Sequence, residues 1–368
     1  GPGYYFGNLH VEEDQTDHSQ DERDRTDMRE IIIKENEAGQ RLDKFLKKYM
    51  KEAPASFFYK MLRKKNIVLN GKKAGGNEKL AVGDRVKLFL SDDTISKFSG
   101  EAPEKRKADK EKAGGGAMEL PLEIIYEDSQ IMLLNKPAGM LSQKAGKTDV
   151  SMVEAVQGYL LRSGQITEEE LRTFRTSVCN RLDRNTSGLI TAGKTLAALQ
   201  QLSQVFQERT VEKWYLCIVK GCVRESGSIR GFLTKDERTN QVAVGSRGKT
   251  AIETDYVPAA WNDEMTLLKV HLITGKTHQI RAHLASIGHP ILGDPKYGDS
   301  RWNGRYQKKY GICTQMLHAW HLTFPVMEAP LEAVSGHTYE APVPEKFWQI
   351  IKETKWQHGI QEALEVQH

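Results

Sequence analysis

The sequence contains no long hydrophobic run and no clustered cysteines. No apolar run approaches the ~20 residues that a helix needs to cross a bilayer, so we expect no membrane partner. The cysteines lack CxxC spacing, which argues against a zinc site and a disulfide framework. Without a secretory signal, the chain is expected to be a cytoplasmic protein with reduced thiols. The four cysteines are Cys179, Cys217, Cys222 and Cys313.

Signals for cofactors and metals are also missing. The chain has no glycine-rich nucleotide loop and no set of residues with metal-ligand spacing. Histidines 278, 283 and 289 do not form an HExxH pair. In a helix beginning at Thr277, the residues Ile280, Leu284 and Ile287 would form the buried stripe, and these histidines would form hydrogen bonds around it. We therefore expect neither a cofactor nor a metal.

Charge is nearly balanced over the whole chain but unevenly distributed. The 53 lysines and arginines exceed the 49 aspartates and glutamates by a formal net charge of +4. Acidic residues gather in the first thirty residues, which offer little for a core, so residues 1–30 are predicted to be a disordered tail. The remaining body is more basic than the total, as expected of a protein that meets a polyphosphate.

Residues 31–90 predict a compact module. Apolar residues at helical spacing indicate two short helices, the second after a Ser56 N-cap, and Asn70-Gly71 indicates a hairpin turn. Cations on the second helix and the hairpin suit a nucleic-acid backbone, because neutralised phosphates release counterions. A solvated basic face is the alternative. The candidate RNA-binding residues are Lys60, Arg63, Lys64, Lys65 and Lys72.

Composition then divides the rest of the chain into three parts. Residues 91–118 are rich in Lys, Glu, Asp, Ala and Gly and predict a flexible linker. Residues 119–353 alternate strand-like and helical stretches without a regular βαβ order, which predicts an α+β domain with much antiparallel pairing. Residues 354–368 are left as a C-terminal tail.

The most informative stretch is residues 179–189, which read Cys-Asn-Arg-Leu-Asp-Arg-Asn-Thr-Ser-Gly-Leu. An arginine on each side favours an ionised Asp183. The small residues that follow suit a loop that holds this side chain out of regular structure. A surface loop with a solvated ion pair is the alternative for such a motif by itself.

Four further blocks accompany this stretch, one upstream and three downstream, and all five follow the order of one known family. They are Asn135-Lys136-Pro137-Ala138-Gly139, Lys213-Trp214-Tyr215, Leu317-His318-Ala319 and residues 274–298, which read TGKTHQIRAHLASIGHPILGDPKYG. Together the five blocks resemble the RluA family of pseudouridine synthases. One position departs from that family's pattern, since Asn180 stands where the family usually has His. An amide can still position the loop through hydrogen bonds.

The resemblance implies the pseudouridine synthase fold, which is a large, mostly antiparallel sheet with a central cleft. It implies that Asp183 is the essential catalytic residue of a cofactor-free isomerisation, acting either on carbon or as a base on the sugar. The target base would leave its stack, with Arg181 inserting into the vacated space and Tyr215 stacking on the uracil. Arg281 would pair with Asp183, and Ile280 would form an apolar pocket wall.

Residues 31–90 contain a lysine-rich second helix and three short motifs, which are Arg41-Leu42-Asp43-Lys44-Phe45-Leu46, Val68-Leu69-Asn70-Gly71-Lys72 and Val82-Gly83-Asp84. Together these features resemble the RNA-binding domain of ribosomal protein S4. This resemblance implies that the module docks structured RNA, and it favours large-subunit ribosomal RNA over transfer RNA as the substrate. We expect the protein to act as a monomer. Two other classes remain open, a non-catalytic RNA-binding or ribosome-assembly protein and a glycoside hydrolase. A glycoside hydrolase usually needs two carboxylates about 5 to 10 Å apart, whereas this motif supplies one.

Overall fold

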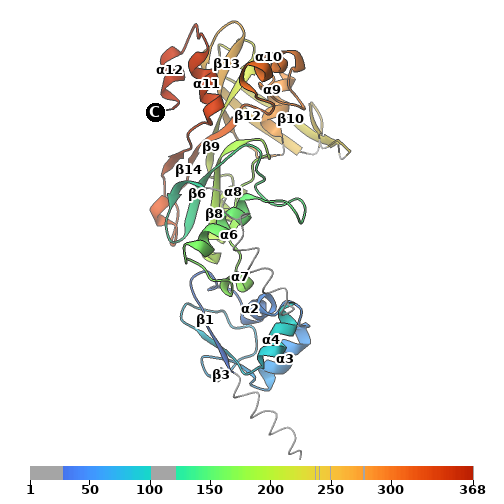
Figure 1. Cartoon of the computed structure of the whole chain (residues 1–368), viewed down its shortest axis with the longest axis vertical. Coiled ribbons are helices and arrows are strands. Elements are labelled where there is room, and N and C mark those ends of the chain that lie inside the picture. The colour runs from blue at the N-terminus through green and yellow to red at the C-terminus, as the bar shows by residue number, and fades with distance from the viewer. Residues whose placement is uncertain are drawn as a thin grey trace, which may run out of the picture. The chain divides into compact units, whose positions relative to one another are not determined.

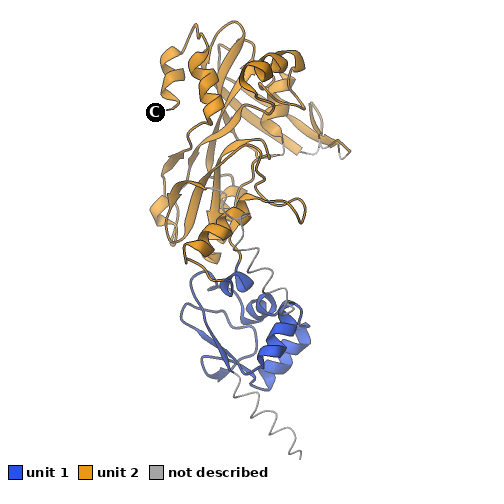
Figure 2. Ribbon diagram, in the orientation of Figure 1, with its two compact units in different colours: residues 1–114, 168–174 blue, residues 115–167, 175–368 orange. Residues whose placement is uncertain are grey.

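The computed structural model describes residues 28–100, 122–236, 238–239, 241–248, 250–276 and 278–367. The chain forms two compact units, which are coloured separately in Figure 2. Unit 1 comprises residues 1–114 and 168–174, and unit 2 comprises residues 115–167 and 175–368. Residues 1–27 of the predicted acidic tail and residues 101–118 of the predicted linker lie outside the described residues.

Unit 1 is built on a four-stranded antiparallel sheet with the strand order β1-β4-β2-β3. Its helices pack their apolar residues into one core, in which Phe45 and Leu46 are fully buried. The strands are β1 Arg29–Ile32, β2 Ile67–Leu69, β3 Lys72–Lys73 and β4 Arg85–Leu88. The helices are α2 Leu42–Tyr49, α3 Ala55–Arg63, α4 Asp92–Ser99 and α7 Glu170–Thr173.

The local signals of this module largely predict its elements. Asn70 and Gly71 both have positive φ angles, as the tight turn between β2 and β3 requires. The expected Ser56 N-cap was wrong, because α3 begins at Ala55 after Pro54. Proline fits this position since its fixed φ suits the start of a helix and no hydrogen bond needs its missing N–H.

The expectation of a linker from residue 91 was also wrong at its start. The Ser91 side chain accepts a hydrogen bond from the Thr94 N–H and caps α4, which ends at Gly100 with a φ of 73°. Ile95 is fully buried in the core of unit 1, and the ring of Phe98 lies 4.5 Å from that of Phe57. Two apolar residues on one helical face therefore order a segment whose composition is mostly polar.

Unit 2 contains an 11-stranded sheet, which is mostly antiparallel as expected (Figure 1). Its main path is β11-β10-β12-β13-β9-β14-β8-β6-β5, with β15 beside β14 and β7 beside β8. Strands β14 and β8 form a parallel pair. The strands are β5 Glu123–Glu127, β6 Ile131–Lys136, β7 Ser177–Val178, β8 Ser187–Gly193, β9 Glu212–Lys220, β10 Gly227–Asp236, β11 Gln241–Gly245, β12 Thr250–Trp261, β13 Met265–Leu272, β14 Leu317–Thr323 and β15 Thr338–Glu340.

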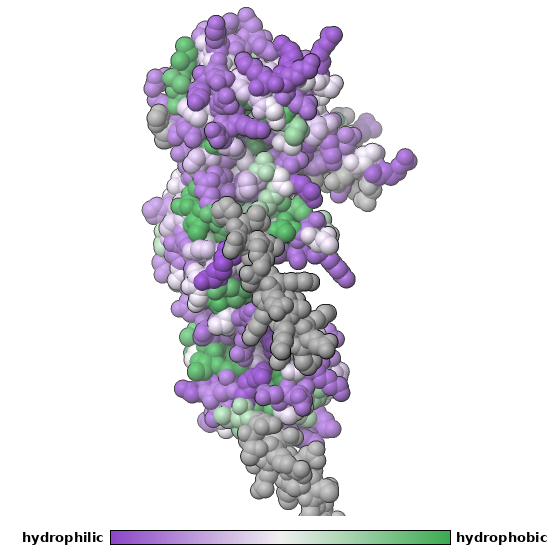
Figure 3. Space-filling model, viewed as in Figure 1, coloured by the Kyte–Doolittle hydropathy of each residue, from purple (hydrophilic) through white to green (hydrophobic). Residues whose placement is uncertain are grey.

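Helices cover this sheet over two apolar clusters. One cluster joins α8 to residues of β6, β8 and β14, and the other joins α10, α11 and α12 to residues of β9, β12 and β13. No helix in the described part of the chain is long and apolar enough to span a membrane. On the face seen in Figure 3, hydrophilic residues predominate and hydrophobic residues form separate patches. The helices are α6 Met152–Arg162, α8 Leu196–Gln207, α9 Gln279–Ser286, α10 Ser300–Tyr310, α11 Glu345–Glu353 and α12 Ile360–Glu365, with a 3₁₀ turn at Glu332–Val334.

The prediction of a C-terminal tail at residues 354–368 was wrong for residues 354–367, which the structure describes. Helix α12 packs onto unit 2, and Ala363 is fully buried in the same cluster as Trp356 and Val366. Gly359 precedes the helix with a φ of 72° and lies against the backbone of Ala259, where a side chain would collide. The segment is short and polar in sequence, so its few apolar anchors were overlooked.

Candidate active site

Asp183 lies in the loop between β7 and β8, and Asn180 ties this loop to β8. The Asn180 amide donates to the Leu189 carbonyl at 3.0 Å. Its oxygen accepts from the Thr191 N–H at 2.8 Å and from the Thr191 hydroxyl at 2.9 Å. The amide thus positions the loop through hydrogen bonds, as we expected for a position where the family usually has His.

The segment after β6 holds the other side of the same loop. The Ser142 hydroxyl donates to the Leu182 carbonyl and accepts from the Leu182 N–H, both at 2.9 Å. The buried Lys136 ammonium donates to the carbonyls of Pro137, Met140 and Arg184 at 2.6 to 2.9 Å. Burial lowers the pKa of Lys136 to about 7, while Asp183 acts in the opposite direction. The loop is therefore fixed immediately before and after Asp183.

Arg281 connects Asp183 to a second, fully buried carboxylate. Its Nη1 donates to Oδ2 of Asp183 at 3.1 Å, and its Nε and Nη2 donate to the two oxygens of Asp294 at 2.7 and 2.9 Å. Burial would raise the pKa of Asp294, but the bonds from Arg281 and from the backbone N–H groups of Lys296 and Tyr297 outweigh it and lower that pKa. The bidentate pair fixes the plane of the guanidinium that faces Asp183.

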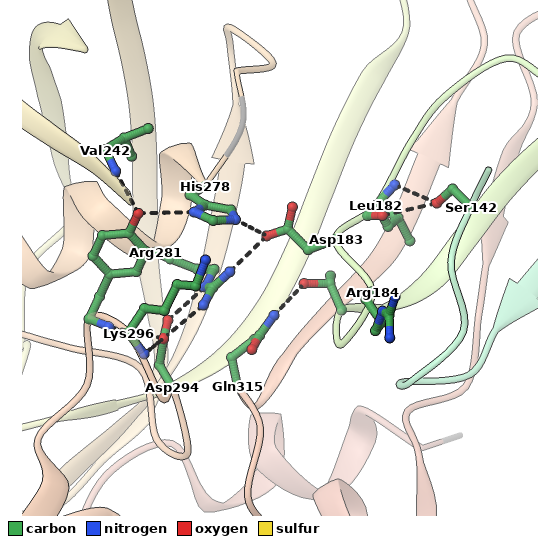
Figure 4. A network of polar contacts seen from close by, with 12 residues as sticks. Ser142, Leu182, Asp183, Arg184, Val242, His278, Arg281, Asp294, Lys296 and Gln315 are labelled. Atoms are coloured by element: carbon green, nitrogen blue, oxygen red, sulfur yellow. Dashed lines mark hydrogen bonds and ion pairs between the residues drawn. The ribbon is translucent and has the colours of Figure 1, made fainter. Parts of the chain in front are cut away.

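His278 faces the same oxygen of Asp183 as Arg281 does (Figure 4). Its Nε2 lies 3.9 Å from Oδ2, and its Nδ1 lies 2.9 Å from the Tyr297 hydroxyl, which accepts the Val242 N–H at 2.8 Å. Burial lowers the pKa of His278, and Arg281 lowers it further, against the effect of Asp183. If the ring is neutral, a proton on Nε2 keeps the lone pair of that nitrogen from facing a lone pair of Asp183 Oδ2. Nδ1 is then the acceptor, and the Tyr297 hydroxyl donates to it.

Sequence reasoning missed the place of His278 beside Asp183. Its φ of 57° is the left-handed conformation, which is uncommon for a residue with a side chain and is found at functional sites. No pattern in the sequence signals this backbone angle. The predicted helix in fact begins at Gln279, and Ile287 lies beyond its end and is 37% exposed, so the proposed stripe is reduced to Ile280 and Leu284.

Tyr215 lies in the middle of the sheet, on β9. It pairs with Val270 of β13 and Ala319 of β14 and is almost fully buried. Burial raises the pKa of Tyr215, and the negative charge of Asp183 raises it further, so the phenol stays protonated near that carboxylate. Gly188, with a φ of 120°, lets β8 approach the backbone of Ala319 where a side chain would collide. The Asp183 loop and the strand of Tyr215 are thereby joined through β14.

The remaining predicted residues are divided between the two units. Ile280 is buried next to Arg281 in α9. Arg181 is exposed, and its Nη1 donates to Gln143 at 3.2 Å. In unit 1, the five predicted RNA-binding cations are all exposed at the end of α3 and on the β2–β3 hairpin. The Cys179 thiol, although close to the loop, is partly buried, and this burial raises its pKa to about 12, which makes it a poor nucleophile.

Comparisons with known proteins agree on one family. A family model described as RNA pseudouridylate synthase matches residues 130–286. Ribosomal large subunit pseudouridine synthase C of Vibrio vulnificus (strain CMCP6) is 32% identical over 89% of this chain and 97% of that protein. The protein of the same name from Vibrio cholerae serotype O1 (strain ATCC 39315 / El Tor Inaba N16961) is 33% identical over 84% of this chain and 93% of that protein. The solved structure of human RNA Pseudouridylate Synthase Domain Containing 1 is 23% identical, with a TM-score of 0.45, over 65% of this chain and 96% of that chain.

The sequence blocks and the Vibrio relatives define the class as RNA-modifying isomerases. The chain belongs to the RNA pseudouridine synthase family, of the RluA type. It is an enzyme that isomerises uridine to pseudouridine.

Proposed function

We propose that the substrate is large-subunit ribosomal RNA and that Asp183 is the catalytic carboxylate of a cofactor-free reaction. The names of the Vibrio relatives support the substrate. The observation that carries the catalytic assignment is that Arg281 and His278 both face Oδ2 of Asp183 (Figure 4). About a quarter of the Asp183 side chain, 27%, remains exposed for a substrate.

The chemistry requires an anion that is held in place and still accessible. Isomerisation breaks the bond from C1′ of the ribose to N1 of the base, turns the base, and joins C5 to C1′, while C5 loses a proton and N1 gains one. No atoms are gained or lost overall. Asp183 supplies the carboxylate that acts at the ribose, with one oxygen held by Arg281 and the other directed away from it in Figure 4.

Base flipping fits the positions of the neighbouring residues. Extruding a base from its stack costs a few kcal/mol and is offset by contacts in the pocket. Tyr215 on β9, whose pKa the charge of Asp183 raises, would provide the aromatic surface, and Ile280, next to Arg281 on α9, would provide the apolar one. The exposed Arg181, two residues before Asp183, inserts into the space that the base leaves.

Unit 1 is proposed to dock the RNA as an S4-like domain. Its five exposed cations lie close together in sequence, on one helix end and the following hairpin. Within the described residues none of the five forms an ion pair, so their charges are available to phosphates.

Pseudouridine mapping on ribosomal and transfer RNA tests the proposal directly. Wild type is expected to modify specific uridines of large-subunit ribosomal RNA without added cofactor, and Asp183→Asn to modify none while binding the RNA within about tenfold of wild type. Asp263→Asn, which changes an exposed aspartate at the β12–β13 turn, is the matched control and should retain full turnover.

Two outcomes would reject parts of the proposal. Turnover by Asp183→Asn would remove the catalytic role of Asp183, and modification restricted to transfer RNA would overturn the substrate. Release of free uracil would indicate glycosidic hydrolysis in place of isomerisation.

A further inference from the structure

A pocket of about 250 Å³ lies beside the start of β9, and no residue proposed so far to act in the reaction lines it. The end of α8 and the turn after it form one wall, including Phe206 and Arg209. Lys213 of β9 and His271 of β13 form the opposite wall.

The pocket adjoins the candidate active site through two elements. Lys213 and Tyr215 are two residues apart on β9, so their side chains point to the same face of the sheet with Cα atoms about 6.6 Å apart. A Cβ placed on Gly275 would lie 3.2 Å from the Lys213 ammonium. Gly275 belongs to the segment between β13 and α9, which leads to His278 and Arg281.

Two unpaired cations line the pocket. Lys213 is half-buried; burial lowers its pKa, and the charge of Arg209 lowers it further. Within the described parts of the chain, neither side chain forms a hydrogen bond or an ion pair. Glu212, the one carboxylate among the lining residues, accepts a hydrogen bond from the indole N–H of Trp214 at 2.9 Å. A half-buried ammonium facing another cation is unfavourable unless an anion joins them.

The backbone of Arg209 adopts the left-handed conformation that ends α8. Arg209 has a φ of 59°, in the left-handed region, although it carries a long side chain. A left-handed residue just after a helix is a common way for the helix to end, and here the Thr210 N–H donates to the Val205 carbonyl at 3.1 Å, as such a turn requires. Here the conformation ends α8 and places Arg209 among the lining residues with Lys213.

We propose that Lys213 and Arg209 bind one backbone phosphate of the RNA, adjacent to the target uridine. The inference deepens the proposed function and rests on it for the identity of the RNA. A phosphodiester supplies the single compact anion that two converging cations require, and it carries no base-specific information. The pocket therefore fixes the register of the strand at the site and does not read its sequence.

Kinetics of two variants test the proposal once the modified uridine is mapped. Lys213→Met and Arg209→Gln should each raise KM roughly tenfold, with kcat within about twofold of wild type. Each should also reduce the slope of log(kcat/KM) against log[KCl] by about 1. Lys352→Met, which removes an exposed cation on α11, is the matched control and should leave both unchanged. Variants that behave like this control would overturn the proposal.

A neutral linkage in the RNA identifies the phosphate. A single methylphosphonate is moved along the linkages around the target, and affinity is measured with Asp183→Asn so that turnover is not needed. One linkage should weaken binding, and the same linkage should have no further effect when Lys213→Met is added. If the methylphosphonate changes affinity by the same amount with and without Lys213→Met at every linkage, the assignment is wrong.

Inorganic phosphate serves as the alternative occupant. If 10 mM phosphate protects Lys213 from amine acylation but no linkage is sensitive to Lys213→Met, the pocket is a free-anion site and the RNA assignment fails. Protection by RNA that is lost with the methylphosphonate at one linkage supports the proposal. Absence of pseudouridine in ribosomal RNA with wild type would reject the proposed substrate alone, because protection of Lys213 by unmodified RNA is measured without turnover and without a mapped target.

Discussion

At the scale of single residues, the site depends on a chain of charges in which Arg281 is the middle member. Its guanidinium is almost fully buried and contacts Asp183 on one side and Asp294 on the other. Asp294 does not reach Asp183, but it takes up two of the three donor groups of Arg281 and thereby orients the third. Asp294 is therefore a positioning residue.

Replacing Asp294 tests this arrangement. Asp294→Asn removes the fully buried charge that pairs with Arg281 and leaves it only the partly exposed Asp183, so we expect a loss of about 3 kcal/mol in the free energy of unfolding. Misplacement of Arg281 should lower kcat about 100-fold, with KM nearly unchanged. Single-turnover kinetics and urea unfolding measure the two effects. A variant that loses stability but keeps wild-type kcat would show that Asp294 only stabilises the fold.

The sequence predicts the members of this site better than their connections. Asp183, Arg281 and Ile280 stand in blocks that the family resemblance recognises, and the structure places Arg281 against Asp183. Asp294 stands in the same downstream block and went unassigned, because its partner lies 13 residues away and on another element. The left-handed backbone of His278 depends on packing around it, which a linear pattern cannot report.

At the scale of elements, the parallel contact between β8 and β14 joins the Asp183 loop to the strand beside Tyr215. His318 of β14 is fully buried at this contact, where Nδ1 pairs with the Ser187 hydroxyl and Nε2 with the Ala341 carbonyl, both at 2.8 Å. A carbonyl only accepts, so Nε2 carries the proton and Ser187 donates to Nδ1. Burial lowers the pKa of His318 to about 4.

This histidine makes stability depend on pH in a defined window. Its folded pKa lies below the unfolded value of about 6.5, so the unfolded chain binds the proton first as the pH falls. The contribution of His318 is full above pH 6.5 and is lost between pH 6.5 and 4, by up to a few kcal/mol. His318→Gln keeps an N–H donor for Ala341 without titrating. Urea unfolding at pH 7.5 and 5 should show a smaller loss of stability for this variant than for wild type, and an equal loss would contradict the assignment.

Elements with strong periodicity were predictable, whereas short polar helices were not. Helix α2 shows four apolar residues at helical spacing, all of them buried. Helices α4 and α12 each rely on very few apolar residues, Ile95 in one and Ala363 in the other. These helices are held in place by contacts with strands and helices that are distant in sequence. Local composition does not report such contacts, so it predicted a linker and a tail at those positions.

At the scale of the whole molecule, the exposed cations of unit 1 and the chemistry of unit 2 should be separable. Replacing Lys60, Arg63, Lys64, Lys65 and Lys72 by glutamine removes charge from an exposed surface without altering the core of unit 1. We expect weaker RNA binding and a salt slope lower by up to about 5, with kcat at saturating RNA close to wild type.

Filter binding over a series of KCl concentrations measures the slope, and single-turnover assays measure the chemistry. A control that replaces five exposed lysines and arginines on helices α10 and α11 of unit 2 corrects for net charge: Arg301, Lys308, Lys309, Lys346 and Lys352. If both variants weaken binding equally, general attraction accounts for the effect and unit 1 is not a specific docking surface.

The chain returns to unit 1 at residues 168–174, and this affects both how the protein folds during translation and how its gene can recombine. Thr173 donates to the buried Glu37 at 2.7 Å, and the Tyr49 hydroxyl donates to Glu169 at 2.7 Å, so these residues complete contacts begun more than a hundred residues earlier. A ribosome must therefore translate well into the second unit before the first has all its partners. For the same reason, a recombination event that exchanged only the N-terminal coding region would deliver a module without α7, and the recipient would have to supply a compatible one.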